Sequence, residues 1–166
     1  MGSQPEEARR MIQQLSDFLR GNLKKEDQKW VPLSEELQYL QLYLDIEKVR
    51  FGHRLSTVLD IDPQEQDVRI PPMLLQPIVE NAIKFGLYDT TEAITIRITG
   101  RKRADFFEIE IQNPFDPETS YPKVGTGFGL TSVKRRLYLL FARNDLLETR
   151  PVDRTFTTTV KIPQVT

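Results

Sequence analysis

Glycines at every second position from 125 to 129 are the feature that most constrains this fold. The run reads Gly125-Thr126-Gly127-Phe128-Gly129-Leu130. Glycine weakens the interior of both helices and strands, so the run predicts irregular backbone. Apolar residues at helical spacing follow at once, which predicts a helix over about 127–141. Its expected buried residues are Leu130, Val133, Leu137, Leu140 and Phe141.

A glycine loop that opens a helix is a favourable place for an anion. Gly125, Gly127 and Gly129 let backbone N–H groups approach closely, and the unpaired N–H groups of the helix start add partial positive charge. Thr126 supplies a hydroxyl, and Leu130 follows the run. A glycine-rich turn with no ligand has the same sequence, so this run alone does not establish a phosphate site.

A second polar stretch, Glu80-Asn81-Ala82-Ile83-Lys84, lies within a predicted helix over 72–85. Asn81 and Lys84 are three residues apart and project from one face. An asparagine carbonyl suits Mg²⁺, and a lysine ammonium suits the phosphates that Mg²⁺ bridges. The alternative is a solvated polar face. The opposite, core-facing side is expected to carry Leu74, Leu75, Ile78 and Ala82.

Asn113 is the third candidate, at the end of a predicted strand over 105–112. Its amide oxygen accepts from an exocyclic amine while its nitrogen donates to a ring nitrogen, which suits adenine; a flipped amide suits guanine. Asparagine before proline is also a common turn former. The proline-rich segment 113–124 is expected to be a loop that acts as a mobile lid. His53, the only histidine, is expected to be a structural or surface residue.

The remaining pattern predicts an α/β fold, a two-layer sandwich with a mixed sheet covered by helices on one face. An N-terminal helix over 5–21 is expected to stop at Gly21-Asn22, and a second helix, capped by Ser34, to run to about Arg50 before Gly52. Gly86 is expected to end the third helix. The expected strands, besides 105–112, are 55–61, one containing Ile94 to Ile98, 145–148 and 156–162.

Composition excludes several classes of function. Lys plus Arg is 23 and Asp plus Glu is 24, a balance that argues against nucleic-acid binding through bulk charge. Zero cysteines exclude disulfides and thiolate metal sites, and one histidine excludes a multi-histidine centre. No apolar stretch approaches the roughly 18–20 residues that cross a bilayer.

The sequence resembles the LytS-type sensor histidine kinases and, within them, the GHKL (Bergerat-fold) ATP-binding catalytic domain. The block Pro71-Pro72-Met73-Leu74-Leu75-Gln76-Pro77-Ile78-Val79-Glu80-Asn81-Ala82-Ile83-Lys84 carries the most specific part of the resemblance. The stretches 31–37, 43–47 and 50–52 also match, as does the glycine run with 133–137.

This resemblance implies the cofactors ATP and Mg²⁺. It implies that Asn81 binds the metal, that Lys84 contacts phosphate or ribose, and that Gly125, Gly127 and Gly129 form the second glycine box. Glu80, next to Asn81, is a weaker candidate for orienting a metal-bound water, because one helical position turns it about 100° away. The γ-phosphate would pass to a histidine outside this chain.

The resemblance also implies an organisation and partners. Residues 1–30 are expected to be the end of a dimerisation helix with its linker, and 31–166 the catalytic part. The expected partners are a response regulator receiver domain and, in the full-length protein, a second copy. A membrane is expected only through regions missing here, which implies the cytoplasmic portion of a bacterial inner-membrane sensor.

Two departures from the family pattern keep alternatives open. The phosphoaccepting Asn-Pro-His-Phe type motif does not occur, and the first glycine box reads Asn113-Pro114-Phe115-Asp116-Pro117, with both glycines lost. An interaction module that kept the fold and lost nucleotide binding is therefore the alternative. A topoisomerase or chaperone ATPase is disfavoured, because Pro77 stands where those enzymes place a base glutamate.

Overall fold

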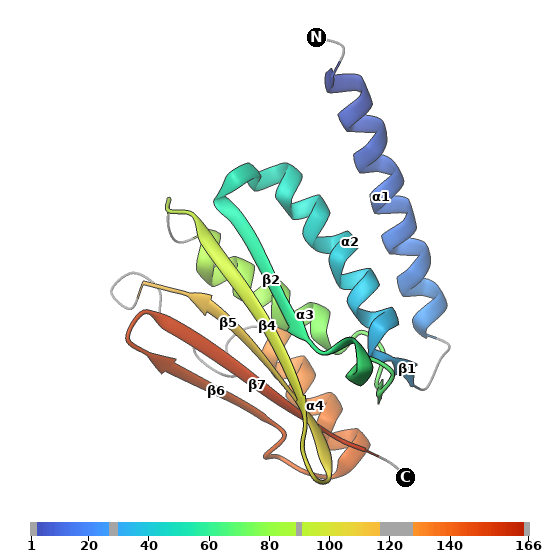
Figure 1. Ribbon diagram of the computed structural model, residues 1–166, viewed down its shortest axis with the longest axis vertical. Helices are drawn as coiled ribbons and strands as arrows, with labels where there is room; N and C mark the ends of the chain where they lie inside the picture. Colours follow the sequence, from blue (N-terminus) through green and yellow to red (C-terminus); the bar gives the residue numbers. More distant parts are fainter. Residues whose placement is uncertain (1–2, 27–29, 89–90, 117–127, 165–166) are drawn as a thin grey trace.

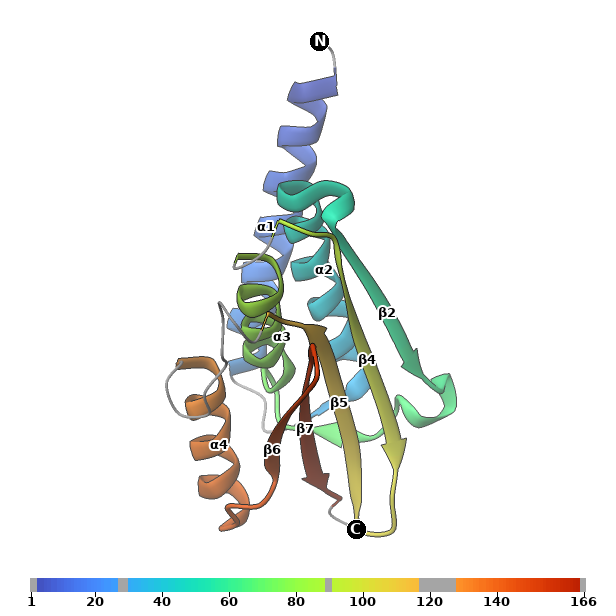
Figure 2. The ribbon, with the colours of Figure 1, turned by 90° about the vertical axis from the view of Figure 1, so that its left-hand side faces the viewer.

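The computed structural model describes residues 3–26, 30–88, 91–116 and 128–164. Its centre is a five-stranded sheet in the order β2-β4-β5-β7-β6. The helices lie on one side of this sheet (Figures 1 and 2). The predicted two-layer sandwich, with a mixed sheet and one helical layer, is confirmed.

The sheet combines one parallel pair with three antiparallel pairs. Side chains alternate between a buried and a more exposed face along β5 and β7, as expected for strands with one covered side. The parallel pair joins β2 to β4. The strands are β2 (Leu55–Ile61), β4 (Ile94–Lys102), β5 (Phe106–Pro114), β6 (Leu147–Val152) and β7 (Thr155–Pro163).

The helical layer consists of α2 (Leu33–Phe51), α3 (Leu75–Ile83) and α4 (Phe128–Phe141), and α1 (Ser3–Glu26) packs along α2. The core of the described residues is mostly aliphatic, with the buried aromatic rings of Phe107, Phe115 and Phe156. No described helix is both long and apolar enough to span a membrane.

A two-stranded sheet supports the start of α2. It pairs β1 (Val31–Pro32) with β3 (Arg69–Ile70) in antiparallel register. Sequence patterning missed it, because two residues are too few to show a period. Short 3₁₀ turns, η1 (Gly52–Arg54) and η2 (Pro63–Glu65), flank β2, and His53 is exposed in the first of them.

Two predicted boundaries of the N-terminal helices were wrong. The helix α1 continues through Gly21-Asn22 to Glu26, because a single glycine lowers helix stability without ending a long helix. Ser34 does not cap α2; the N-cap is Pro32, and the Ser34 N–H donates to the Gln66 carbonyl at 2.9 Å. The predicted end at Gly52 is confirmed, with a positive φ of 60°.

The third helix differs at both ends. It begins at Leu75 because Met73, with a positive φ of 60°, breaks the helical path after the two prolines. Beyond Ile83 the chain continues as one π-helical turn, η3 (Lys84–Tyr88). Gly86 therefore lies inside this turn instead of ending the helix.

Three smaller expectations also need correction. Leu140 is 47% exposed, so it is not part of the core, whereas Leu130, Val133 and Leu137 are buried as predicted. The strand expected over 145–148 is displaced to Leu147–Val152. Asn113 lies within β5, which extends to Pro114, instead of following its end.

Candidate functional site

The described residues predicted for the site lie on elements that meet at one end of the sandwich. The turn η3 contacts β5, and a Cβ added to Gly86 would lie 3.5 Å from the carbonyl oxygen of Pro114. The helix α3 packs against α4 and β5. After α4 the chain enters β6, whose first residue, Leu147, pairs near the end of β7. The start of α4 therefore lies near the end of β5 and the end of α3 (Figure 2).

Asn81 lies on α3 beside the core stripe, with only 9% of its surface exposed. The predicted core residues Leu74, Leu75, Ile78 and Ala82 are buried, as expected, but they do not all lie on the side of the helix opposite Asn81. Asn81 is three residues from Ile78, which is about 60° around the helix axis. It is thus a polar group held at the margin of the packed interior.

Lys84 is exposed at the first position of η3, and its ammonium lies 5.6 Å from the centre of the Phe85 ring. A single π-helical turn of this kind often marks a functional site. Arg54 stabilises this turn, because its guanidinium donates to the Leu87 carbonyl at 3.1 Å. Sequence analysis missed Arg54, because its contact is 33 residues away along the chain.

Asn113 is almost fully buried, at 2% exposure, and sits opposite Phe156 of β7. Its Nδ2 donates to the carbonyl of Pro114 at 3.0 Å. The side chain faces the helical layer, as do its buried neighbours on β5 two residues apart. Asn113 and Asn81 are therefore on the same side of the sheet.

Part of the glycine run lies outside the described residues. This holds for Gly125, Thr126 and Gly127 and for most of the predicted lid. Gly129 lies in the first turn of α4, and Leu130, at 2% exposure, packs into the core. A role for Leu130 at a ligand is thus limited to its backbone.

Glu80 is exposed, one position before Asn81, and its carboxylate accepts from Gln76 Nε2 at 2.9 Å. The negative charge of Glu80 also acts on the carboxylate of Glu47 in α2. Burial raises the pKa of Glu47, the nearby Arg50 lowers it, and the Glu80 charge adds to the rise. Glu80 thus lies on the side of α3 that faces α2, and Asn81 on another side.

The described residues contain no group of three or more histidine, cysteine, aspartate or glutamate side chains that could hold a metal ion. The described residues therefore do not provide a site that would hold a cation by protein side chains alone. They fit Mg²⁺ held by one or two protein oxygens together with substrate phosphates and water. Asn81, the residue predicted to bind the metal, carries an amide oxygen on α3, and Lys84 follows it by one helical turn.

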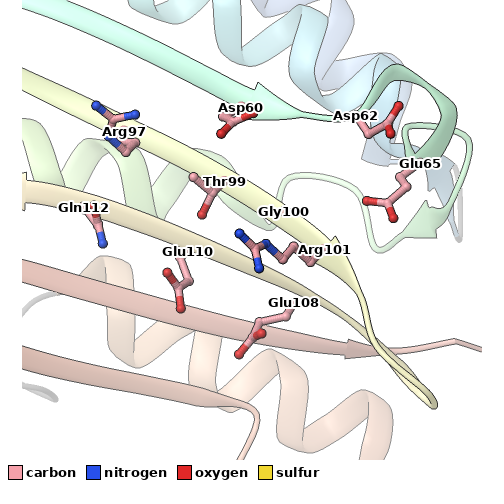
Figure 3. Close-up of a pocket in the computed structure, with 10 residues that line it drawn as sticks. All are labelled: Asp60, Asp62, Glu65, Arg97, Thr99, Gly100, Arg101, Glu108, Glu110 and Gln112. Atoms are coloured by element: carbon pink, nitrogen blue, oxygen red, sulfur yellow. The ribbon is translucent and has the colours of Figure 1, made fainter.

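The open face of the sheet carries a separate hollow of about 390 Å³. Five carboxylates and two arginines line it, on strands and turns that face away from the helices (Figure 3). The residues drawn are Asp60, Asp62, Glu65, Arg97, Thr99, Gly100, Arg101, Glu108, Glu110 and Gln112. An acidic surface repels polyphosphate, so this hollow is not the candidate site.

Comparisons with known proteins agree with this arrangement. A family model described as "Histidine kinase" matches residues 1–55. The sensor protein LytS of Oceanobacillus iheyensis is 46% identical over 96 residues, which is 57% of this chain and 16% of LytS. The sensor histidine kinase BtsS of Escherichia coli K12 is 34% identical over 135 residues, 80% of this chain and 23% of BtsS. The chain therefore spans less than a quarter of these relatives.

Solved structures show the same fold. The catalytic domain of histidine kinase ThkA superposes with a TM-score of 0.59 at 17% identity, covering 82% of this chain and 95% of that domain. Histidine kinase AdeS of Acinetobacter baumannii gives a TM-score of 0.61 at 15% identity over 92% of this chain and 78% of its own. With the fold, the block around Asn81 and these relatives in agreement, the chain belongs to the LytS-type sensor histidine kinases and carries their GHKL catalytic fold with a preceding helix.

Proposed function

We propose that this chain binds Mg-ATP and donates the γ-phosphate to a histidine outside it. The observation that supports this most is the meeting of α3, η3, the end of β5 and the start of α4 at one end of the sandwich. That meeting brings together an amide oxygen donor, a lysine and a helix N-terminus, drawn from segments far apart in sequence. Each group matches a different part of a nucleotide triphosphate.

Asn81 is the proposed metal ligand. Its position at the margin of the core restricts its rotamers, so the carboxamide oxygen is presented with little loss of conformational entropy on binding. Mg²⁺, when bound, would neutralise charge on the phosphates. Lys84, exposed and one helical turn beyond, places a positive charge beside the same phosphates.

The start of α4 is the proposed anion cradle. Unpaired N–H groups of its first turn, with those of Gly125 and Gly127, donate to the phosphate oxygens, and Thr126 adds a hydroxyl. Phosphoryl transfer needs positioning and charge stabilisation more than covalent participation by the protein. In this proposal the protein fixes donors and cations around the phosphates before the reaction begins.

Asn113 is proposed to select the base. Because its Nδ2 donates to the Pro114 carbonyl, its Oδ1 is the atom directed to a ligand amine. An acceptor at this position favours adenine, which carries an exocyclic amine, over guanine, whose corresponding group is a carbonyl. The loss of the first glycine box thus leaves one base-reading group in place.

The domain organisation and partners are also proposals. We infer that 1–30 is the end of a dimerisation helix with its linker and that 31–166 is the catalytic part. We propose that a response regulator receiver domain accepts the phosphoryl group from the histidine outside this chain. One of the structurally similar proteins is histidine kinase ThkA in complex with response regulator protein TrrA. Attachment to a bacterial inner membrane would come from parts of the protein beyond this chain.

Calorimetric titration of the chain with a non-hydrolysable ATP analogue tests the proposal. We expect the analogue to bind only when Mg²⁺ is present. We expect Asn81→Ala to lower the affinity for the analogue by about 10- to 100-fold, because one contact to a charged group contributes about this much. No heat at high micromolar analogue would instead favour the alternative, a GHKL-fold interaction module that has lost nucleotide binding.

Glu80→Gln is the matched variant on the same helix. Its carboxylate accepts from Gln76 and faces α2, so we expect analogue affinity within about threefold of the parent chain. Loss of phosphotransfer with intact affinity would support the predicted role of Glu80 in orienting a metal-bound water. Equal loss of affinity in both variants would contradict the assignment of the metal to Asn81.

A further inference from the structure

The C-terminal half of α4 is held by the segment that follows α1. Trp30 comes four residues after Glu26, the last residue of α1, and just before β1. Its ring meets the ring of Phe141, the last residue of α4, with centroids 5.7 Å apart and planes at 84°. Both rings are partly buried against the core. An edge-to-face pair of this kind fixes relative orientation as well as distance.

Opposite charges on the first turn of α2 and on α4 also act on each other. Glu36 is only 3% exposed, and Arg136 of α4 is half-buried. Burial lowers the pKa of Arg136, and the nearby Glu36 carboxylate acts in the opposite direction. The negative charge of Glu36 thus favours the charged form of Arg136, which its partial burial disfavours.

Arg136 and Phe141 both lie in the C-terminal half of α4, away from the N-terminal end that is proposed to bind nucleotide. The helix starts at Phe128, directly after Gly127, and ends at Phe141. Its 14 residues span about 21 Å. A helix of this length moves as a rigid body, so a displacement of its C-terminal half changes the position of its first-turn amides.

We propose that Trp30, Glu36, Arg136 and Phe141 form a clamp, the α4 clamp, that positions the glycine end of α4. Trp30 and Glu36 act as positioning residues: they set nucleotide affinity through α4 and do not touch the ligand. This inference rests on the proposed function.

Coupling of this kind is reciprocal. If the clamp alters nucleotide affinity, then nucleotide binding alters the surroundings of the clamp. Trp30 is the only tryptophan in the chain, so its fluorescence reports on the clamp alone. A contact that serves only to stabilise the fold would not respond to a ligand at the other end of α4.

The experiment follows Trp30 emission while the 166-residue chain is titrated with Mg²⁺ and a non-hydrolysable ATP analogue. We expect a saturable change whose midpoint equals the calorimetric dissociation constant. Trp30→Ala and Arg136→Met should each weaken binding about fivefold or more, and Trp30→Phe, which keeps an aromatic edge, should restore most of the affinity. Leu139→Ala, at a position 72% exposed on the same helix, is the control and should change nothing.

Arg136→Met removes a positive charge that acts on the buried Glu36 carboxylate, so Glu36→Gln with Arg136→Met keeps the test valid if the single variant does not fold. In the folded double variant, Trp30 emission should no longer follow nucleotide binding. Normal calorimetric binding with unchanged Trp30 emission and unchanged affinity in Trp30→Ala would overturn the clamp and leave the proposed function intact. No heat from the unsubstituted chain would overturn the proposed function and the clamp together.

Discussion

Glu47 shows how a single carboxylate responds to its position between two helices. It lies on α2, its Oε2 is buried without a hydrogen-bond partner in the described structure, and Glu80 of α3 adds negative charge nearby. Burial is the main cause of its raised pKa, with Arg50 acting against it. The ionised form of Glu47 is therefore less favourable in the folded protein than in the unfolded chain.

This raised pKa predicts a pH dependence of stability. The favourable contribution of protonated Glu47 is fully present below its ordinary pKa of 4.5 and is lost as pH rises through the higher folded value. We expect Glu47→Gln to stabilise the protein by about 0.5 kcal/mol at neutral pH, and this gain to vanish in acid. Urea unfolding of both proteins across pH measures it, and an unchanged difference at every pH would contradict it.

Sequence could identify the polar residues of the candidate site but not their burial. The three-residue spacing of Asn81 and Lys84 fixes their relation on one helix. The same spacing relates Asn81 to Ile78, and only the packing of α3 between α4 and the sheet decides that Asn81 is covered while Lys84 is exposed. Arg54 had no sequence signal, since its contact with Leu87 arises from the tertiary fold.

At the scale of the element, β4 depends on a residue without a side chain. Gly100 pairs with Ile61 in β2 and with Ile109 in β5. A Cβ there would lie 2.9 Å from Cε1 of Phe107 and 3.2 Å from Cδ1 of Ile61. The Phe107 ring is fully buried and cannot turn away freely.

We therefore expect Gly100→Ala to destabilise the protein by about 1–3 kcal/mol, the usual cost of overpacking a core. Chemical denaturation with a two-state fit measures the loss. Arg101→Ala, one position along the same strand and exposed, is the control and should stay within about 0.5 kcal/mol of the parent. Similar losses in both variants would show that β4 is sensitive to substitution in general and not to volume at Gly100.

Strands were predicted better than helix ends. Ile94, Ile96 and Ile98 alternate with polar residues, and the period of two identifies a half-buried strand without any tertiary knowledge. Helix ends depend on weaker local preferences. Gly21 is accommodated within α1, and Gly86 within a π-helical turn, because neighbouring contacts outweigh the small cost of one glycine.

At the scale of the whole molecule, α1 has apolar side chains that the other described residues leave exposed. Ile12 is 64% exposed and Leu15 is 43% exposed. In the proposed dimer of the longer protein, a second copy of this helix would bury them. The catalytic fold lies beyond α1, so this surface and the nucleotide site should respond separately to substitution.

We accordingly expect Ile12→Glu with Leu15→Glu to lower the dimer fraction of the longer protein and to leave its nucleotide affinity within about twofold. Sedimentation equilibrium measures the first and calorimetry the second. Ser16→Glu, on the same helix, is the control: it adds one negative charge at a position that is already polar. A dimer fraction that is equal in all three proteins would contradict the role proposed for α1.

The position of β7 within the sheet has a consequence for biosynthesis. It is the last strand in chain order, yet it lies between β5 and β6 and supplies hydrogen bonds to both. A polypeptide emerging from the ribosome therefore holds β5 with one open edge and β6 with no neighbour until Thr155–Pro163 has been translated. Release of the chain before this segment is translated would leave β5 and β6 without the hydrogen bonds of β7, and such a chain would be a substrate for chaperones or proteases.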